Sequence, residues 1–173
     1  MEKLLKFKGM TIPPSAESYN LKTEQHLSLL NDSKLITWFA NNSLLGCTIS
    51  SLDEIISQIE YTPTYSAQSM ILGLCNVRGQ VVHLLRNSWL LMKLGLAQTT
   101  QSDDFSFIAN HALIFKFNDM RYGFIAPELG PVIDTTQFQS KRWLNTSINE
   151  TLIFTSGTTS VVSFLPKELL AHE

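Results

Sequence analysis

The sequence predicts a mainly β protein built of small barrels rather than a sandwich, with two short helices and a C-terminal helix. Two observations predict this class. Short apolar runs follow one another along the chain, each bounded by Asn, Gly or Pro residues that favour turns. In addition, 44% of the 173 residues are hydrophobic and 16% are charged, which is enough apolar material for a core and argues against disorder.

Ordered structure is expected to begin near Lys34, after an N-terminal extension over residues 1–33. Pro13-Pro14 interrupts any helix in the extension, and the leucines at 27, 29 and 30 form one apolar patch that would anchor a poorly ordered segment. The runs 35–40 and 43–49 then predict a hairpin, because Asn41-Asn42 between them tolerates positive φ.

The period of the apolar residues changes after this hairpin. Leu52, Ile55, Ile56 and Ile59 follow the i, i+3, i+4, i+7 spacing of one helical face. Ser51 and Glu54 have the spacing of a capping box, and Pro63 lies beyond the end of the pattern. These features predict a helix over residues 51–59.

Two strands, 70–75 and 81–85, are predicted next, and Asn76-Val77-Arg78-Gly79 lies between them. Gly79 can take the left-handed backbone that a tight reversal requires. Ser88 is placed to cap a short helix over residues 89–94, which Gly95 ends. The polar stretch 97–104 is typical of a linker or a long surface loop.

The second half of the chain is again β-rich. The run 112–117 is predicted to pair with 121–126 across Asn118-Asp119, and 131–134 is a short apolar segment. The runs 151–155 and 161–165 flank Gly157. Pro166 then opens a terminal helix over residues 167–172, at a position where proline is tolerated.

Several function classes receive no support from the sequence. A formal net charge of −2 without a basic stripe argues against nucleic-acid binding. No apolar run approaches the roughly 20 residues of a membrane helix, so no direct membrane insertion is expected. The two distant cysteines, Cys47 and Cys75, fit a reducing, cytoplasmic compartment as buried hydrophobes.

Motifs for chemistry are missing as well, so neither catalysis nor a cofactor is expected. The eight glycines form no phosphate loop, and no nucleophile elbow occurs. No metal site is expected, because the spacing of the histidines does not suit ligation: His26, His83, His111 and His172. His83 is interpreted as a buried, hydrogen-bonded histidine or as a surface residue on the alternate strand face.

The segment 73–85, Gly-Leu-Cys-Asn-Val-Arg-Gly-Gln-Val-Val-His-Leu-Leu, resembles the signature of the CheW family of chemotaxis coupling proteins. In that signature a strand ends in Asn-x-Arg-Gly and continues as an apolar strand. Residues 52–56 resemble the family's helix with its Glu-Ile pair, 112–126 its second-lobe hairpin and 165–170 its closing strand-to-helix step. The resemblance covers roughly residues 34–170.

This resemblance implies two packed five-stranded β-barrels within a domain over residues 34–173, with lobe 1 at about 34–96 and lobe 2 at about 105–173. It also implies a non-enzymatic adaptor that binds the regulatory domain of a CheA-type histidine kinase and the cytoplasmic tips of chemoreceptors, at membrane-associated arrays. The implied partner-binding residues all lie in lobe 1: Glu54, Ile55, Gly73, Asn76, Arg78 and Gly79.

The chain also departs from the family pattern. His83 stands where proline is frequent and Arg86 where aspartate is common, which suggests a divergent paralogue for a pilus-type or other specialised array. Two interpretations of Arg78 stay open, a partner contact or a local ion pair with the element that carries Glu54. Gly79 is also explained by its backbone conformation alone.

Two other functions stay open beside the coupling role. The chain could be a small-molecule-binding or enzymatic β-barrel protein, or a CheW-like module with a partner other than a kinase. A deep polar cavity would favour the first of these, whereas two filled barrels with a surface groove favour the adaptor.

Overall fold

The computed structural model describes residues 6–7, 10–11, 33–65, 70–97, 108–142 and 151–171. The leucine patch at 27–30, the polar stretch from residue 98 onward and the end of the terminal helix at His172 lie outside the described residues. β1 (Lys6–Phe7) and β2 (Met10–Thr11) pair as a small antiparallel sheet within the predicted extension.

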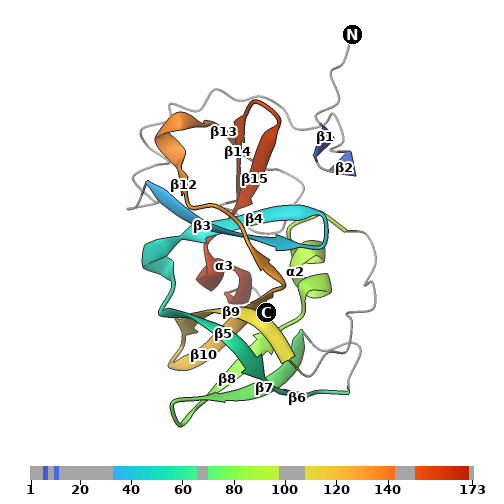
Figure 1. The fold of residues 1–173 in the computed structure, drawn as a ribbon, viewed down its shortest axis with the longest axis vertical. Coiled ribbons are helices and arrows are strands. Elements are labelled where there is room, and N and C mark those ends of the chain that lie inside the picture. Colours follow the sequence, from blue (N-terminus) through green and yellow to red (C-terminus); the bar gives the residue numbers. More distant parts are fainter. Residues whose placement is uncertain are drawn as a thin grey trace.

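The described chain forms two curled sheets with few helices, which confirms the mainly β prediction (Figure 1). The six-stranded sheet has the order β5-β9-β10-β8-β7-β6, with bounds β5 Glu54–Glu60, β6 Thr62–Pro63, β7 Ile71–Val77, β8 Gln80–Leu85, β9 Ile108–Phe117 and β10 Met120–Ala126. The seven-stranded sheet has the order β11-β3-β4-β15-β14-β13, with β12 also on β3; the bounds are β3 Lys34–Ala40, β4 Ser43–Thr48, β11 Glu128–Leu129, β12 Ile133–Asp134, β13 Gln139–Arg142, β14 Leu152–Ser156 and β15 Thr159–Ser163.

Each sheet contains five longer strands plus two-residue pieces. Without β6 the first sheet has five strands, and without β11 and β12 the second also has five. Both sheets take strands from both halves of the chain: β5 to β8 join β9 and β10, while β3 and β4 join β11 to β15. The sheets therefore do not follow the predicted lobe ranges 34–96 and 105–173, because the chain enters each sheet twice.

The predicted helix over residues 51–59 is wrong. A short 3-10 helix, η1 (Ile49–Ser51), is followed by strand β5, which pairs with β9 from Glu54↔Ile114 to Glu60↔Ile108. Gln58 has a φ of 53°, which interrupts the alternation of a regular strand. Ile56 and Ile59 therefore both face the same apolar cluster although they are three residues apart, which imitates a helical period.

The capping box is absent for the same reason. Ser51 donates its hydroxyl to the carbonyl of Thr48 at 2.7 Å. The Glu54 carboxylate is instead engaged by arginine side chains, as described below.

The three predicted turns are all formed, and each contains at least one residue with left-handed backbone. Asn41 joins β3 to β4 with a φ of 52°. Asn118 and Asp119 join β9 to β10 with φ values of 48° and 61°. Arg78 and Gly79 join β7 to β8 with φ values of 52° and 81°, so both central residues, and not Gly79 alone, take the conformation of a type I′ turn.

The helices differ slightly from the prediction at their starts. α2 spans Asn87–Lys93, so Ser88 lies inside the helix and is buried rather than acting as its cap. Gly95 follows its end with a φ of 66°, as predicted. α3 spans Pro166–Leu170 and begins at the predicted proline; η2 (Thr135–Gln137) is a further 3-10 turn.

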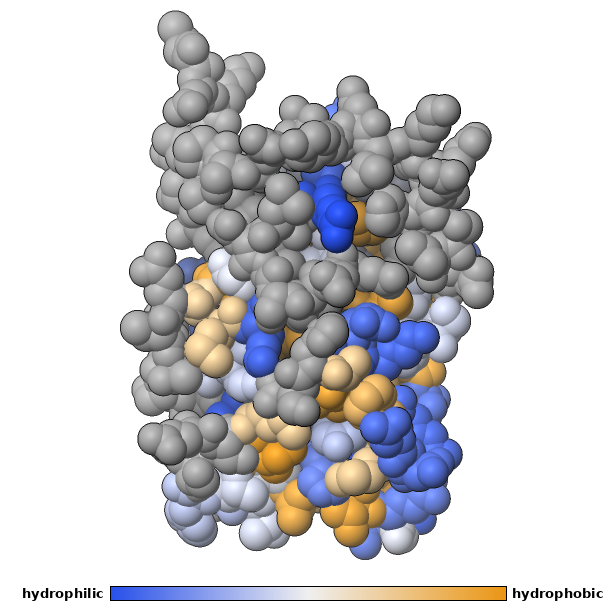
Figure 2. Space-filling view, turned by 180° about the vertical axis from the view of Figure 1, so that it is seen from behind, coloured by the Kyte–Doolittle hydropathy of each residue, from blue (hydrophilic) through white to orange (hydrophobic). Residues whose placement is uncertain are grey.

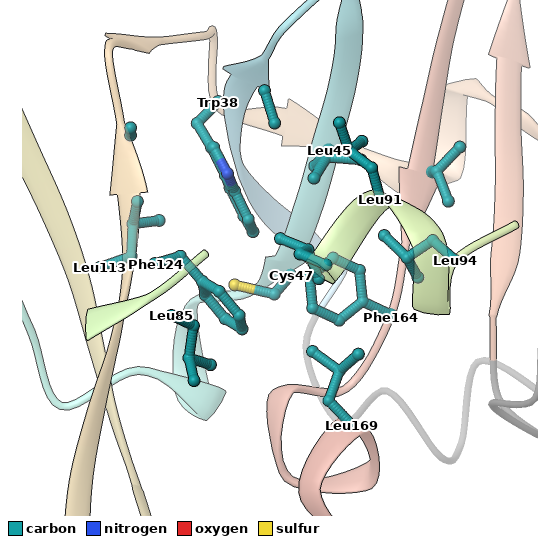
Figure 3. Packing of buried hydrophobic residues seen from close by; sticks show 14 of the residues in the cluster. Trp38, Leu45, Cys47, Leu85, Leu91, Leu94, Leu113, Phe124, Phe164 and Leu169 are labelled. Atoms are coloured by element: carbon teal, nitrogen blue, oxygen red, sulfur yellow. The ribbon is translucent and has the colours of Figure 1, made fainter. Parts of the chain in front are cut away.

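One apolar cluster joins the two sheets, and α2 and α3 lie between them (Figure 1). Trp38 of β3 stacks on Phe124 of β10 with ring centroids 5.5 Å apart, and Phe164 packs edge-on against both rings. Leucines of α2 and α3 point into the same cluster (Figure 3). Because this cluster contains side chains of both sheets, burial of its aromatic surface fixes the sheets relative to each other.

Candidate partner-binding surface

The β7–β8 turn presents Arg78 on a backbone whose conformation is fixed locally. The two flanking strands pair up to Val77↔Gln80, which leaves Arg78 and Gly79 as the only loop residues. The side-chain oxygen of Asn76 accepts a hydrogen bond from the Gly79 N–H at 2.8 Å. No atom within 4 Å would contact a Cβ at Gly79, so its φ of 81° is the reason for glycine at this position.

Arg78 forms an ion pair with Glu54, the local partner that the sequence suggested. Its Nη2 lies 3.2 Å from Glu54 Oε2, although Glu54 belongs to a strand and not to the predicted helix. The Arg78 side chain is 82% exposed and that of Glu54 only 17%. The arginine therefore keeps most of its donors accessible to a partner while its own carboxylate is largely covered.

Arg121 of β10 is a member of this site that sequence reasoning missed. Its Nη2 donates to Glu54 Oε1, and its Nε lies 3.9 Å from Asp53 Oδ2. Only 10% of the Arg121 side chain is exposed. The two oxygens of Glu54 thus serve different arginines, one at the surface and one inside; Arg78, Arg121, Glu54 and Asp53 are called the ion-pair cluster below.

The position of Arg121 follows from a parallel pairing that no local pattern reveals. β10 pairs with β8 in parallel, and Arg121 lies opposite Val82. The β7–β8 and β9–β10 turns therefore lie at the same end of the sheet. The sequence indicates only that Arg121 follows the Asn118-Asp119 turn. Its contact with Glu54 can be predicted only when the parallel pairing of β8 with β10 is known.

The ion-pair cluster also helps to close the curled sheet. β5 and β6 are the outer strands of the sheet order, and Tyr61 alone connects them in the chain. At the other end of β5, Glu54 reaches Arg78 of the β7–β8 turn across the curl. One covalent connection and one ion pair thus hold the two outer regions of the sheet together.

The six predicted partner-binding residues fall into two groups. Glu54, Asn76, Arg78 and Gly79 come together at the turn end of the sheet. Ile55 follows Glu54 and is 38% exposed, but its side chain points to the opposite face of β5. Gly73 is buried in β7, where a Cβ would lie 2.5 Å from both the Thr62 carbonyl oxygen and Tyr61 Cδ2, so its role here is close backbone packing.

His83 and Cys75 have the unremarkable surroundings expected from the sequence. His83 is half-buried on β8, with Nδ1 3.3 Å from the Arg121 carbonyl oxygen and its ring 5.5 Å from that of Tyr122. Cys75 is buried, and burial raises the pKa of its thiol, while the positive charge of Arg121 acts in the opposite direction.

Arg86, one of the departures from the family pattern, is a buried structural residue. Its side chain donates to the Thr64 carbonyl oxygen at 3.1 Å, and its backbone N–H donates to the Met70 carbonyl oxygen at 2.8 Å. The arginine at this position therefore holds together the two described ends of the β6–β7 connection.

Apolar side chains of the described residues fill the interior of the six-stranded sheet. Its cluster contains Ile59, Leu72, Val82, Leu84 and Ile114, among others. The described part of the chain holds no group of three His, Cys, Asp or Glu residues placed to bind a metal ion. No helix among these residues is long and apolar enough to cross a membrane.

The fold resembles that of the scaffolding protein TtCheW from Thermoanaerobacter tengcongensis, with a TM-score of 0.56 and 17% sequence identity. The superposition covers 80% of this chain and 92% of that protein's chain. A scan against protein-family models and a search of curated proteins found no match. The comparison establishes a CheW-like fold of two curled sheets for this chain.

Proposed function

We propose that this protein is a non-enzymatic coupling protein of a chemosensory system, which joins the regulatory domain of a CheA-type histidine kinase to the cytoplasmic tip of a chemoreceptor. It would act in the cytoplasm, at membrane-associated receptor arrays. The CheW-like fold supports this proposal at the level of architecture. The observation that carries it is the arrangement of Arg78, an exposed guanidinium on a rigid turn whose carboxylate partner has a second, buried arginine.

This arrangement suits an interface because Arg78 can bind a second carboxylate without leaving Glu54 unpaired. Removing the only partner of a covered carboxylate leaves an uncompensated charge, which is strongly unfavourable. Here Arg121 stays with Glu54 when Arg78 turns toward a partner. The planar guanidinium can bind a carboxylate of a partner with two parallel hydrogen bonds.

The other predicted residues have supporting roles in this proposal. Asn76 and Gly79 fix the turn, and Gly73 allows β6 to approach β7. Ile55 adds an exposed apolar side chain on the face of β5 opposite to Glu54. The filled sheet interior supports an adaptor over a small-molecule-binding or enzymatic barrel.

The proposal is tested by substituting Arg78 and titrating kinase and receptor fragments. If Arg78 pairs with a partner carboxylate in a desolvated patch, Arg78→Ala weakens binding by about 2–4 kcal/mol, as interface hot spots do. Arg78→Lys should bind more tightly than Arg78→Ala but less tightly than the unmodified protein, because lysine keeps the charge but cannot form two parallel hydrogen bonds with one carboxylate. Arg142→Ala, at an exposed arginine of the seven-stranded sheet, is the control and should bind normally.

Two results would count against the proposal. A folded Arg78→Ala variant that binds both fragments like the unmodified protein would show that Arg78 does not contribute to partner binding. Failure of the unmodified protein to bind any CheA-type kinase of its own organism would favour a CheW-like module with a different partner.

A further inference from the structure

A polar groove lies on the seven-stranded sheet, where β13 and the end of η2 meet the β14–β15 turn (Figure 1). Its volume of about 400 Å³ lies within the range of about 300–1,000 Å³ that small-molecule sites occupy. The described residues that line it carry amide, ammonium or hydroxyl groups or no side chain: Gln137, Gln139, Lys141, Thr155, Ser156 and Gly157. This lining suits a polar ligand, because an apolar one would cover polar groups without pairing them.

Strand pairing directs these side chains to the outer face of the sheet. Gln139 lies opposite Thr155, and Lys141 lies opposite Ile153. Residues directly opposite each other, and residues two apart on one strand, point to the same face. Phe154, between Ile153 and Thr155, points to the other face and belongs to the apolar cluster inside the curled sheet. The groove is therefore a feature of the surface and not an opening into the packed interior.

Lys141 is the one charged residue among the described residues that line the groove. Its cross-strand neighbour Ile153 is buried and belongs to the cluster that joins the two sheets. The Lys141 side chain is itself partly buried. An aliphatic stem that lies over Ile153 leaves the ammonium group at the groove, as long cationic side chains do on apolar surfaces. The position of the charge is therefore restricted by packing of the stem.

The polar side chains of the groove are not engaged elsewhere in the described part of the chain. Within these residues, no hydrogen bond or ion pair is formed by the following side chains: Gln137, Gln139, Lys141 and Ser156. The Thr155 hydroxyl donates only a long hydrogen bond, 3.5 Å, to the Gln139 carbonyl oxygen. Asp134, at the start of η2, is not in the lining, and its Oδ1 accepts from the N–H and the hydroxyl of Thr136 at 3.0 and 2.7 Å. The groove thus offers several donors and one positive charge to a ligand.

A second groove, of about 390 Å³ on the six-stranded sheet, differs in its chemistry. Its lining includes the apolar Val81 and Met120, and it contains Asp119 as well as Lys116. Hydrophobic and hydrophilic residues are also mixed over the part of the six-stranded sheet that Figure 2 shows, at the lower end of the molecule. Of the two grooves, that of the seven-stranded sheet combines an unpaired cation with a lining that contains no described carboxylate.

We propose that the groove of the seven-stranded sheet binds the phosphate group of a small phosphorylated metabolite. The Lys141 ammonium supplies the opposite charge, and the hydroxyls of Thr155 and Ser156 donate to phosphate oxygens. The amides of Gln137 and Gln139 bind hydroxyl groups of the rest of the ligand. A phosphate monoester presents three acceptor oxygens, which uses these donors more fully than the two oxygens of a carboxylate. The site is on a different sheet from the ion-pair cluster and does not depend on the coupling role.

The test is a titration of the full-length, nitrogen-15-labelled protein, followed through its backbone amide resonances. Ribose 5-phosphate is the probe, and ribose and gluconate are the comparison ligands without phosphate. Ribose 5-phosphate should shift the resonances of Thr155, Ser156 and Gly157 until saturation, and inorganic phosphate should compete with it. Ribose should cause no such shifts, and gluconate should bind at least threefold more weakly. A phosphoserine peptide is titrated in parallel, to separate a small metabolite from a phosphorylated protein segment.

Variants test the assignment of the donors. Lys141→Gln should weaken binding of ribose 5-phosphate at least tenfold, and Thr155→Val at least threefold. The matched control is Lys116→Gln, which removes the lysine of the other groove and should bind like the unmodified protein. Absence of saturable shifts with ribose 5-phosphate overturns the proposal, as does equal binding by Lys141→Gln and Lys116→Gln. Gluconate binding as tight as that of ribose 5-phosphate, or binding of the phosphoserine peptide alone, also overturns it.

Discussion

Replacement of Arg121 by methionine should destabilise the protein much more than loss of Arg78 does. Arg121 is 10% exposed and its guanidinium binds Glu54, which is itself 17% exposed. Arg121→Met keeps most of the apolar stem and removes the charge, so Glu54 keeps only the 82% exposed Arg78 as its cation. Breaking a buried pair costs about 3–5 kcal/mol, and for this partly covered pair we expect about 2–4 kcal/mol of unfolding free energy.

The two comparison variants separate this effect from general disruption. Arg78→Ala removes only the exposed half of the cluster, so the expected loss is under about 1 kcal/mol. The double variant Glu54→Gln, Arg121→Met replaces both charges by neutral groups and should recover most of the stability, because no covered charge is left unpaired.

Urea unfolding at neutral pH and low salt measures all four proteins on one scale, through their midpoints and slopes. A loss for Arg121→Met no larger than that for Arg78→Ala would show that the inner pair does not stabilise the fold. The same conclusion would follow if the double variant were as unstable as Arg121→Met, since the cost would then come from packing and not from the unpaired carboxylate.

Two further predictions concern buried groups. Gly73→Ala places a Cβ 2.5 Å from the Thr62 carbonyl oxygen, so urea unfolding should show a loss of about 1–3 kcal/mol in unfolding free energy. A loss no larger than the experimental error would mean that β6 moves away from the added methyl group at little energetic cost. Burial raises the pKa of the Cys47 thiol from 9.0 to about 12, so the folded protein keeps a proton that the unfolded chain releases near pH 9. Stability should therefore fall as pH rises from 9 toward 12, and more steeply than in Cys47→Ala; equal slopes would contradict the shift.

The sequence was sufficient for the hairpin turns, whose structure depends on neighbouring residues. The hairpin turns at Asn41, at Asn118-Asp119 and at Gly79 were predicted because positive φ is tolerated by few residue types. Residues 52–59 misled for an equally local reason: the left-handed Gln58 places Ile56 and Ile59 on one side of a strand. Single-sequence periodicity cannot distinguish such an interrupted strand from one turn of an amphipathic helix.

The candidate site was only half predictable, because it is assembled from three separate parts of the chain. Glu54 begins β5, Arg78 belongs to the β7–β8 turn and Arg121 follows the β9–β10 turn. The first two are carried by recognisable local patterns, whereas Arg121 joins them only through the parallel pairing of β8 with β10. One long-range contact of the sheet therefore positions the inner partner of Glu54, so a variant that shifts the β8–β10 register should break the Arg121–Glu54 pair, whereas Arg78→Ala should leave that pair intact.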